Sequence, residues 1–304
     1  RGRAGESLAD VRGLAVFACG PAGIWEVLTL RVTVPSFVDV GPTPSIEVLT
    51  RILDEYPRLA VAVVQRDHAR IYLSDQREAQ EQAAVDSEVP GRHDQGGWAQ
   101  ARFQRHIEVH VQRHLKEVVD EIEKLYYERP YRRLAVGGSP EAVDEFVKML
   151  PDPVARRVVG TFPVDLKHDT ETDILERARA LGDDAERRQE RYLVPQAVDA
   201  AGAGGRGVAG VENTFRAVAE GRVHVLLVAG DLALEGAVCG SCGHLAAAAF
   251  ERCPDCGGAG EPVPNVVERT VERAFLAGAQ IETVLGDARD TLLEHGGLAA
   301  VLRY

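Results

Sequence analysis

Apolar residues recur at helical spacing over the segment from Ala99 to Glu128. They come every three or four positions, which places them on one face of a long helix. The helix is expected to end at Arg129-Pro130, because proline cannot continue the backbone hydrogen-bond ladder. The apolar stripe consists of Phe103, Ile107, Val111, Leu115, Val118, Ile122 and Leu125.

Shorter apolar runs precede this helix. Leu59–Gln65 is almost wholly apolar and Ala69–Ser74 is rich in strand-forming residues, so we predict a buried hairpin over these two segments. Polar residues, glycine and proline dominate 76–97, which predicts a long loop between the hairpin and the helix.

Two further strands and a helix are predicted near the beginning of the chain. Leu14–Ala18 is a short apolar run that ends in a turn signal, and Trp25–Val34 alternates as a strand does. Ile46–Tyr56 follows Thr-Pro-Ser and is predicted to be a helix.

A βαβ pattern follows the long helix. Tyr131–Gly137 is a predicted strand, Ser139-Pro140-Glu141 is a helix start with proline at the first position, and Val143–Leu150 continues that helix. Arg156–Thr161 is the next predicted strand.

The remaining chain alternates helices and strands. Asp169–Leu193 is a highly charged predicted helix, and Asp199–Gly210 is a Gly/Ala segment that we interpret as a loop or hinge. Such alternation is typical of a small αβα layered domain, so the fold class is α/β. The predicted helices are 211–220, 266–277 and 287–295, and the predicted strands are 223–229, 281–285 and 298–304.

Composition is that of an ordinary globular protein. The chain has 304 residues, enough for two or three domains, with 45% hydrophobic and 27% charged residues. No apolar run approaches the ~20 residues that span a bilayer, and the first residues show no secretory signal. We therefore expect a cytoplasmic protein without a membrane partner.

The net charge limits how this protein can bind nucleic acid. Lys and Arg number 35 against 47 Asp and Glu, which gives −12. A protein that binds RNA over its whole surface is basic, so that class is excluded. Any contact with nucleic acid needs a local basic patch on an acidic body.

Four of the five cysteines form the strongest motif. Cys239-x-x-Cys242 and Cys253-x-x-Cys256 are separated by ten residues, and glycines beside them allow the tight turns of metal knuckles. Four thiolates make a closed tetrahedral Zn²⁺ site with no position for a catalytic water, so we expect a structural zinc ribbon over 237–260. Free thiols or a redox pair are the alternatives, and Cys19 is expected to be a packing residue.

The required basic patch lies around the start of the long helix. Between Gly91 and Lys116 there are five Lys or Arg and two acidic residues. Guanidinium groups can bind phosphates, and Trp98 beside Gly96-Gly97 can stack on an unpaired base. The side chains expected away from the apolar stripe are Arg102, Arg105, His106, His110, Arg113 and His114.

Simpler interpretations of this patch remain open. The helix face can be merely solvated, with Trp98 folded onto the domain. His106, His110 and His114 have the spacing of a metal stripe, but no carboxylate or cysteine completes the set, so we expect ordinary exposed histidines. The chain has no Gly-x-Ser-x-Gly elbow and no Walker phosphate loop.

These motifs together resemble one family. The chain is similar to archaeal and eukaryotic class-1 peptide chain release factors, to their relative Pelota and to bacterial members of that superfamily, including the hibernation factor Balon. The resemblance rests on the order of three features, namely Gly96-Gly97-Trp98-Ala99-Gln100-Ala101-Arg102-Phe103, the segment 210–228, and the four-cysteine ribbon followed by 295–304.

The resemblance implies a multi-domain α/β fold. Residues 1–56 correspond to a shortened N-terminal domain, and 57–155 to a mixed-sheet middle domain whose Gly-Gly loop and long helix reach the peptidyl transferase centre. Residues 156–304 correspond to an L7Ae-like αβα domain with an inserted zinc ribbon, which in the family meets a translational GTPase. The residues implied at the ribosomal centre are His93, Gln95, Gly96, Gly97, Trp98, Arg102, Arg105 and Arg113.

One departure from the family changes the expected activity. Release factors carry glutamine after Gly-Gly, and Trp98 stands there in this chain. Indole has one donor and no acceptor, so it cannot orient water as an amide can. We therefore expect no enzymatic activity and no catalytic residues, and no codon-reading motif is recognisable.

Three functions follow from these features. The first is a non-catalytic factor that binds the ribosomal A site beside a tRNA, in rescue as for Pelota or in hibernation as for Balon. The second is a peptidyl-tRNA hydrolase that uses Gln95 or Gln100. The third is an off-ribosome interaction module that shares only the fold. Acidic residues such as Glu212, Glu220 and Asp231 favour a protein partner for the C-terminal domain.

Overall fold

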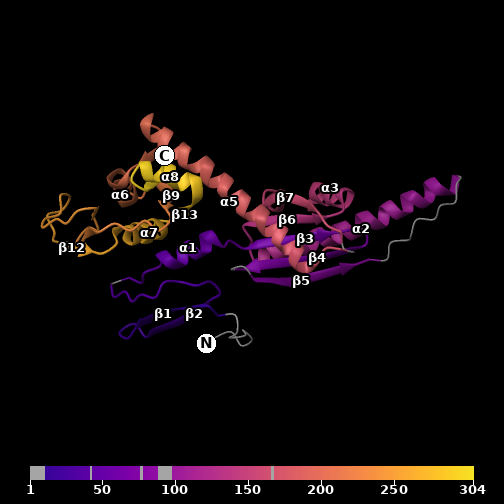
Figure 1. Cartoon of the computed structure of the whole chain (residues 1–304), viewed down its shortest axis with the longest axis horizontal. Coiled ribbons are helices and arrows are strands. Elements are labelled where there is room, and N and C mark those ends of the chain that lie inside the picture. Colours follow the sequence, from indigo (N-terminus) through magenta and orange to yellow (C-terminus); the bar gives the residue numbers. More distant parts are fainter. Residues whose placement is uncertain (1–10, 42, 76–77, 88–97, 166–167) are drawn as a thin grey trace. The chain divides into compact units, whose positions relative to one another are not determined.

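The computed structural model describes residues 11–41, 43–75, 78–87, 98–165 and 168–304. They form two compact units. One consists of Tyr56–Ala185, and the other combines the described part of Arg1–Glu55 with Glu186–Tyr304. Figure 1 shows the elements of both units in sequence colours.

The unit of Tyr56–Ala185 is built on a mixed five-stranded sheet with the order β5-β4-β3-β6-β7. β4 pairs antiparallel with β3 and β5, whereas β6 pairs parallel with β3 and β7. The predicted hairpin and βαβ pattern are therefore confirmed within one sheet. The strands are β3 (Leu59–Val64), β4 (His68–Asp75), β5 (Glu78–Asp86), β6 (Arg133–Gly138) and β7 (Val158–Pro163).

Helices cover both faces of this sheet, which explains why β3 is apolar at every position. Ala60, Ala62 and Val64 pack in one core cluster with residues of α2 (Trp98–Glu128) and α3 (Pro140–Met149). The alternate positions of β3 pack in a second cluster with α5 (Glu171–Gly202). A strand buried on both faces has no polar side, unlike a strand with one solvated face. The short helix α4 (Asp152–Ala155) precedes β7.

The predicted apolar stripe of α2 is confirmed for the side chains that the structure describes. Its members from Ile107 to Leu125 are at most 8% exposed and share the cluster with the sheet. The Phe103 side chain lies outside the described residues.

One predicted loop is partly a strand. Residues 78–86 of the polar segment form β5 at the edge of the sheet, in antiparallel register with β4. Ala79, Ala83 and Val85 of β5 pack against the core and most of its other residues are polar, so the strand carries little of the apolar signal that would identify it. Residues 88–97 of the expected loop lie outside the described residues.

His114 does not lie where the sequence places it. We expected it on the solvated face of α2, but it is 1% exposed, and its Nδ1 lies 2.9 Å from the hydroxyl oxygen of Ser87. Burial lowers the pKa of this imidazole because a charged ring is poorly solvated there. The side chain thus joins α2 to the residue after β5.

The other unit contains a three-layer αβα arrangement. Its four-stranded sheet has the order β13-β9-β14-β8, with β13 parallel to β9 and β14 antiparallel to both neighbours. Leu226 and Val228 of β9 pack with α6 and α7, whereas Val225 and Leu227 pack with α5 and α8. The elements are β8 (Gly207–Ala209), α6 (Val211–Ala219), β9 (Val223–Ala229), α7 (Val266–Leu276), β13 (Gln280–Val284), α8 (Gly286–Glu294) and β14 (Leu298–Leu302).

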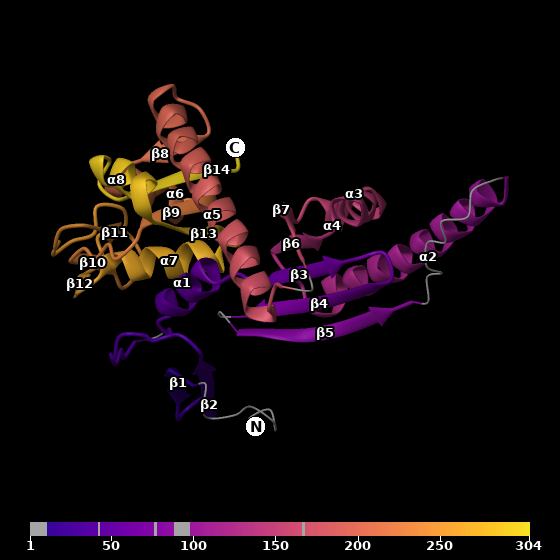
Figure 2. The same cartoon turned by 45° about the vertical axis from the view of Figure 1, so that its right-hand side comes forward.

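Three smaller parts complete this unit. A two-stranded hairpin of β1 (Gly13–Cys19) and β2 (Ile24–Leu30) precedes α1 (Glu47–Glu55). Figures 1 and 2 both show α1 beside α7 and β13. A separate three-stranded ribbon has the order β11-β10-β12. Its strands are β10 (Gly236–Cys239), β11 (Leu245–Ala246) and β12 (Gly260–Val263).

Two sequence-based boundaries differ from the structure. We expected the middle domain to end at 155, but β7 pairs with β6 and the compact unit continues to Ala185. We also interpreted Asp199–Gly210 as a loop or hinge, whereas α5 continues to Gly202 and β8 starts at Gly207. A Cβ at Gly207 would lie 2.3 Å from the carbonyl oxygen of Ala197, so this glycine permits a close backbone approach.

No helix among the described residues is both long enough and apolar enough to cross a bilayer.

The buried His114 predicts acid sensitivity of the Tyr56–Ala185 unit. Its pKa is lowered on folding, so the unfolded chain binds the proton more readily and stability is lost as the pH falls below the ordinary value of 6.5. We expect His114→Leu to flatten the fall in urea-unfolding free energy between pH 7.5 and pH 5. The exposed His106 supplies the control, because His106→Leu should leave the wild-type slope. Equal slopes in all three proteins would contradict this role.

Candidate nucleic-acid interface and metal centre

The basic segment of the sequence corresponds to the first half of α2. Arg105 and Arg113 are exposed there, as expected. Trp98 begins the helix and Arg102 lies near its start, but their side chains are outside the described residues. His93, Gln95, Gly96 and Gly97 also lie outside them, so the placement of these four predicted site residues stays a prediction.

Charge divides α2 into two halves. Residues 98–116 contain four Lys or Arg and one acidic residue, whereas 117–128 contain five acidic residues and one lysine. In the second half Lys124 lies 3.5 Å from Glu121, and Lys116 at the boundary lies 3.6 Å from Asp120. The N-terminal end of a helix also carries the positive end of its macrodipole, which adds to the basic side chains.

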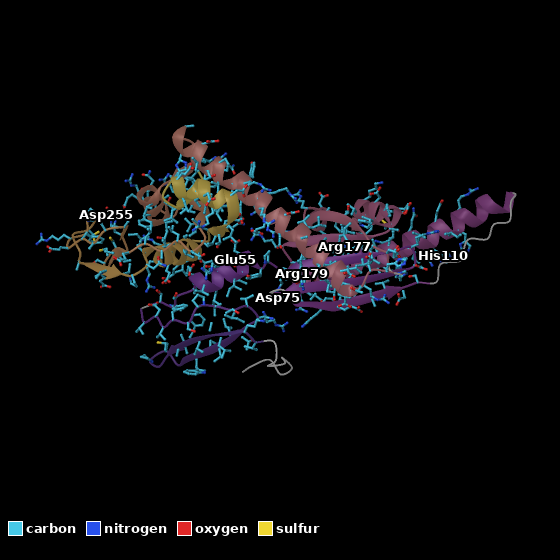
Figure 3. The ribbon with its side chains drawn as sticks, viewed as in Figure 1. Glu55, Asp75, His110, Arg177, Arg179 and Asp255 are labelled. Carbon is cyan, nitrogen blue, oxygen red and sulfur yellow. The ribbon has the colours of Figure 1, made fainter. Side chains whose placement is uncertain are left out.

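Within its unit, the beginning of α2 extends past the ends of β3, β4 and β5 (Figure 1), whereas Ile107, Val111 and Leu115 of the basic half pack in the core. His110 lies near the ends of these strands (Figure 3). An exposed helix end with guanidinium groups can bind phosphates through paired N–H donors. The arrangement is therefore suited to a contact with nucleic acid.

The histidines of α2 do not make a metal stripe. His106 and His110 have ring centroids 4.6 Å apart, but His114 is buried against the sheet. Within the part of the chain that the structure describes, these histidines belong to no group of three ligand atoms close enough to share one ion.

The four predicted cysteine ligands converge in the ribbon. Their four sulfurs lie within 4.8 Å of one another, with Cys239 Sγ 3.5 Å from Cys256 Sγ and Cys242 Sγ 3.5 Å from Cys253 Sγ. A tetrahedron with Zn–S bonds of ~2.3 Å has edges of about 3.8 Å, so the sulfurs are spaced for one metal ion. Cys19 is exposed and remote in sequence from this group, so its expected packing role is wrong.

Two turns of identical form hold the sulfurs. Gly243 N–H donates to the carbonyl oxygen of Cys239 at 2.9 Å, and Gly257 N–H donates to that of Cys253 at 2.9 Å. Both glycines have positive φ, 73° and 74°, where a side chain would be strained. The sequence signal of Cys-x-x-Cys-Gly therefore corresponds to a repeated backbone turn.

Backbone dipoles favour a thiolate in the first turn. The N–H groups of Cys242 and Ser241 point at the Cys239 sulfur and lower the pKa of its thiol to about 6. Since thiolates are the metal-binding form of cysteine, the turn prepares this residue to bind a cation. The four residues thus fit a Zn²⁺ ion by number and spacing.

Supporting contacts around the ribbon could not be predicted from the cysteine spacing. Arg273 of α7 donates to the carbonyl oxygen of Gly243, which ties the first turn to the αβα layers. His244 Nδ1 lies 2.7 Å from Asp255 Oδ2, so the two turns are also joined through side chains. Only the tertiary structure brings these residues together.

Comparison with known proteins gives three similarities. A family model described as bacterial archaeo-eukaryotic release factor family 10 matches residues 44–183. Peptide chain release factor subunit 1 of Methanocaldococcus jannaschii is 27% identical over 291 residues, which cover 85% of this chain and 69% of the relative. The same factor of Archaeoglobus fulgidus is 24% identical over 275 residues, which cover 84% and 68%.

The fold has a counterpart among solved structures. Dom34 of S. cerevisiae, described as a translation termination-like factor, matches with a TM-score of 0.52 and 10% identity over 96% of this chain and 80% of that one. At this identity the similarity concerns the fold alone. The chain is therefore similar in sequence to archaeo-eukaryotic release factors and similar in fold to Dom34.

Proposed function

We propose that this protein is a cytoplasmic factor that binds the ribosomal A site without hydrolysing peptidyl-tRNA. The observation that carries the proposal is the division of charge along α2, whose basic half begins beyond the sheet while its acidic half packs beside it. Ribosomal RNA is a dense array of phosphates, which attracts the first half of the helix and repels the second. Only one end of α2 is thereby suited to enter an RNA-lined site.

Similarity to release factors supports the ribosome as the partner. The archaeal relatives are peptide chain release factors, which supports a role for this chain as a translation factor that associates with the ribosome. An acidic protein of net charge −12 needs a local basic patch to bind RNA, and the start of α2 provides one. We therefore assign the contact with the peptidyl transferase centre to the segment from His93 to Arg113.

The residue after Gly97 argues against hydrolysis. A hydrolytic water must be held by a group that both donates and accepts, and the indole of Trp98 only donates. An aromatic ring suits stacking on a base instead. The competing proposal is a hydrolase in which Gln95 or Gln100 replaces the missing amide.

The αβα layers and ribbon are proposed to serve a protein partner. We infer an L7Ae-like domain with a structural zinc ion and a docking surface for a translational GTPase. Several acidic side chains lie on this unit, among them Glu212, Glu220 and Asp231. They make it a poor match for RNA, although Glu220 and Asp231 also pair with arginines of the unit.

Rescue and hibernation differ in the ribosome that is recognised. A rescue factor prefers stalled ribosomes that hold peptidyl-tRNA, and a hibernation factor prefers idle ribosomes. Co-sedimentation with both kinds of 70S particle separates them. An off-ribosome interaction module would sediment with neither.

Charge reversal on α2 tests the ribosome contact. We expect Arg105→Glu or Arg113→Glu to weaken binding about 10- to 100-fold, because a charge-assisted hydrogen bond contributes roughly 1.5–3 kcal/mol. Co-sedimentation with 70S ribosomes over a salt series measures the change. The control is Lys124→Glu, the same reversal in the acidic half. Equal losses for all three variants, or none, would contradict the proposed interface.

A single-turnover assay with ribosome-bound peptidyl-tRNA tests the proposal that this protein does not catalyse peptidyl-tRNA hydrolysis. We expect the wild-type rate to equal the rate without factor. Trp98→Gln restores an amide and should raise the rate by up to about 100-fold, the scale of one well-placed polar group. Wild-type activity that Gln95→Ala or Gln100→Ala abolishes would establish the hydrolase instead.

Metal content tests the ribbon. We expect about one zinc ion per chain by elemental analysis, because the four thiolates complete one tetrahedral site. The double variant Cys239→Ser/Cys253→Ser should lose the ion and melt at a lower temperature. Cys19→Ser is the matched control and should retain zinc. Purified protein free of zinc, or equal loss in the control, would refute a structural zinc site.

A further inference from the structure

The outer edge of β13 is closed by carboxylates instead of a strand. β13 is the edge strand of the four-stranded sheet, so the N–H groups on its outer side have no ladder partner. The N–H of Thr283 donates to Asp54 Oδ2 at 2.5 Å, and the N–H of Leu285 donates to Glu190 Oε2 at 3.1 Å. Asp54 belongs to α1 and Glu190 to α5.

These carboxylates are buried close to one another. Asp54, Glu190 and Glu282 are 4%, 2% and 1% exposed. Carboxylate oxygens of Asp54, Glu186 and Glu282 lie within 4.8 Å of one another, and Gln189 donates to Glu282 at 3.0 Å. Negative charges at this spacing in a buried site destabilise one another.

The carboxylates also lie where the chain enters and leaves this unit. Asp54 is two residues from Tyr56, where the other unit begins. Glu186 is the first residue after that unit ends at Ala185. One connection therefore leaves the C-terminal end of α1, and the other runs through the middle of α5, and both of these helix segments contact β13 through their carboxylates.

We propose that Asp54, Glu190 and Glu282 form a proton-controlled clasp, which holds α1 and α5 on the edge of β13 when the group contains a proton and loosens when all three are ionised. The clasp regulates how firmly the two chain connections are held. It stands independently of the ribosome function proposed above.

The direction of the response follows from the charges that face Glu190. Burial, together with the negative charges of Glu282 and Asp54, raises the pKa of Glu190 to about 7, although the Leu285 N–H and Arg187 oppose the rise. The closed clasp therefore retains a proton that the open clasp releases at its ordinary pKa of 4.5. The protonation of Glu190 stabilises the closed clasp fully below pH 4.5, and this stabilisation is lost as the pH rises through about 7.

Hydrogen–deuterium exchange of the full chain, resolved to single amides, tests the clasp. After correction for intrinsic rates, we expect the protection of Thr283 and Leu285 to fall about tenfold between pH 6 and pH 8, as follows from one group with pKa values of 4.5 open and about 7 closed. Glu190→Gln keeps an acceptor for Leu285 without a charge, so its protection should change by less than about twofold. Glu176→Gln, at an exposed position of the same helix, should behave as wild type.

Two outcomes would overturn the proposal. One is wild-type protection at β13 that is the same at pH 6 and pH 8, a result that needs no variant. The other is a fall in Glu190→Gln as large as in wild type. Asp54→Asn provides a second neutral variant if Glu190→Gln does not fold, and the amides of Leu226 and Leu227 in the central strand β9 report any global change.

Discussion

The packing of α2 on the mixed sheet determines what the rest of the molecule can do. An apolar stripe from Ile107 to Leu125 packs in one core cluster with residues of β3, β4, β6 and α3. The beginning of the helix extends beyond the strands, and the side chains of Arg105 and Arg113 are exposed. One helix thereby has an apolar face that packs on the sheet and a basic end that projects from it. The orientation of α2 about its own axis determines which of its side chains are buried and which are exposed.

In the other unit, backbone turns position the cysteine side chains. Two equivalent turns place four sulfurs at metal-binding spacing, and Arg273 ties the first turn to α7. Leu245, Val238 and Val263 of the ribbon also pack with the core of the αβα layers. The αβα layers contact α1 and α5 in a different way, since side-chain carboxylates of these helices accept hydrogen bonds at the edge of β13.

Elements with strong periodicity were predictable from the sequence, and elements without it were not. The stripe of α2 and the continuous apolar run of β3 could be predicted because their buried positions are occupied by apolar residue types. β5 escapes prediction because its hydrogen bonds to β4 are made by the backbone, which any residue supplies. We expected His114 on the exposed face of α2, but histidine is chemically suited to both the buried and the exposed face of a helix. The sequence does not show that Ser87 lies within hydrogen-bond distance of His114. The cysteine site was predictable from spacing, whereas Arg273 and Asp255 are brought to it by distant segments.

We propose that the basic end of α2 enters the peptidyl transferase centre of the ribosome. Electron cryo-microscopy of the protein bound to 70S ribosomes tests this placement. We expect density for α2 in the A site of the large subunit, with Arg105 and Arg113 against ribosomal RNA phosphates and the acidic half directed away. Density with the Tyr56–Ala185 unit outside the A site, or with the acidic half of α2 against the RNA, would contradict it.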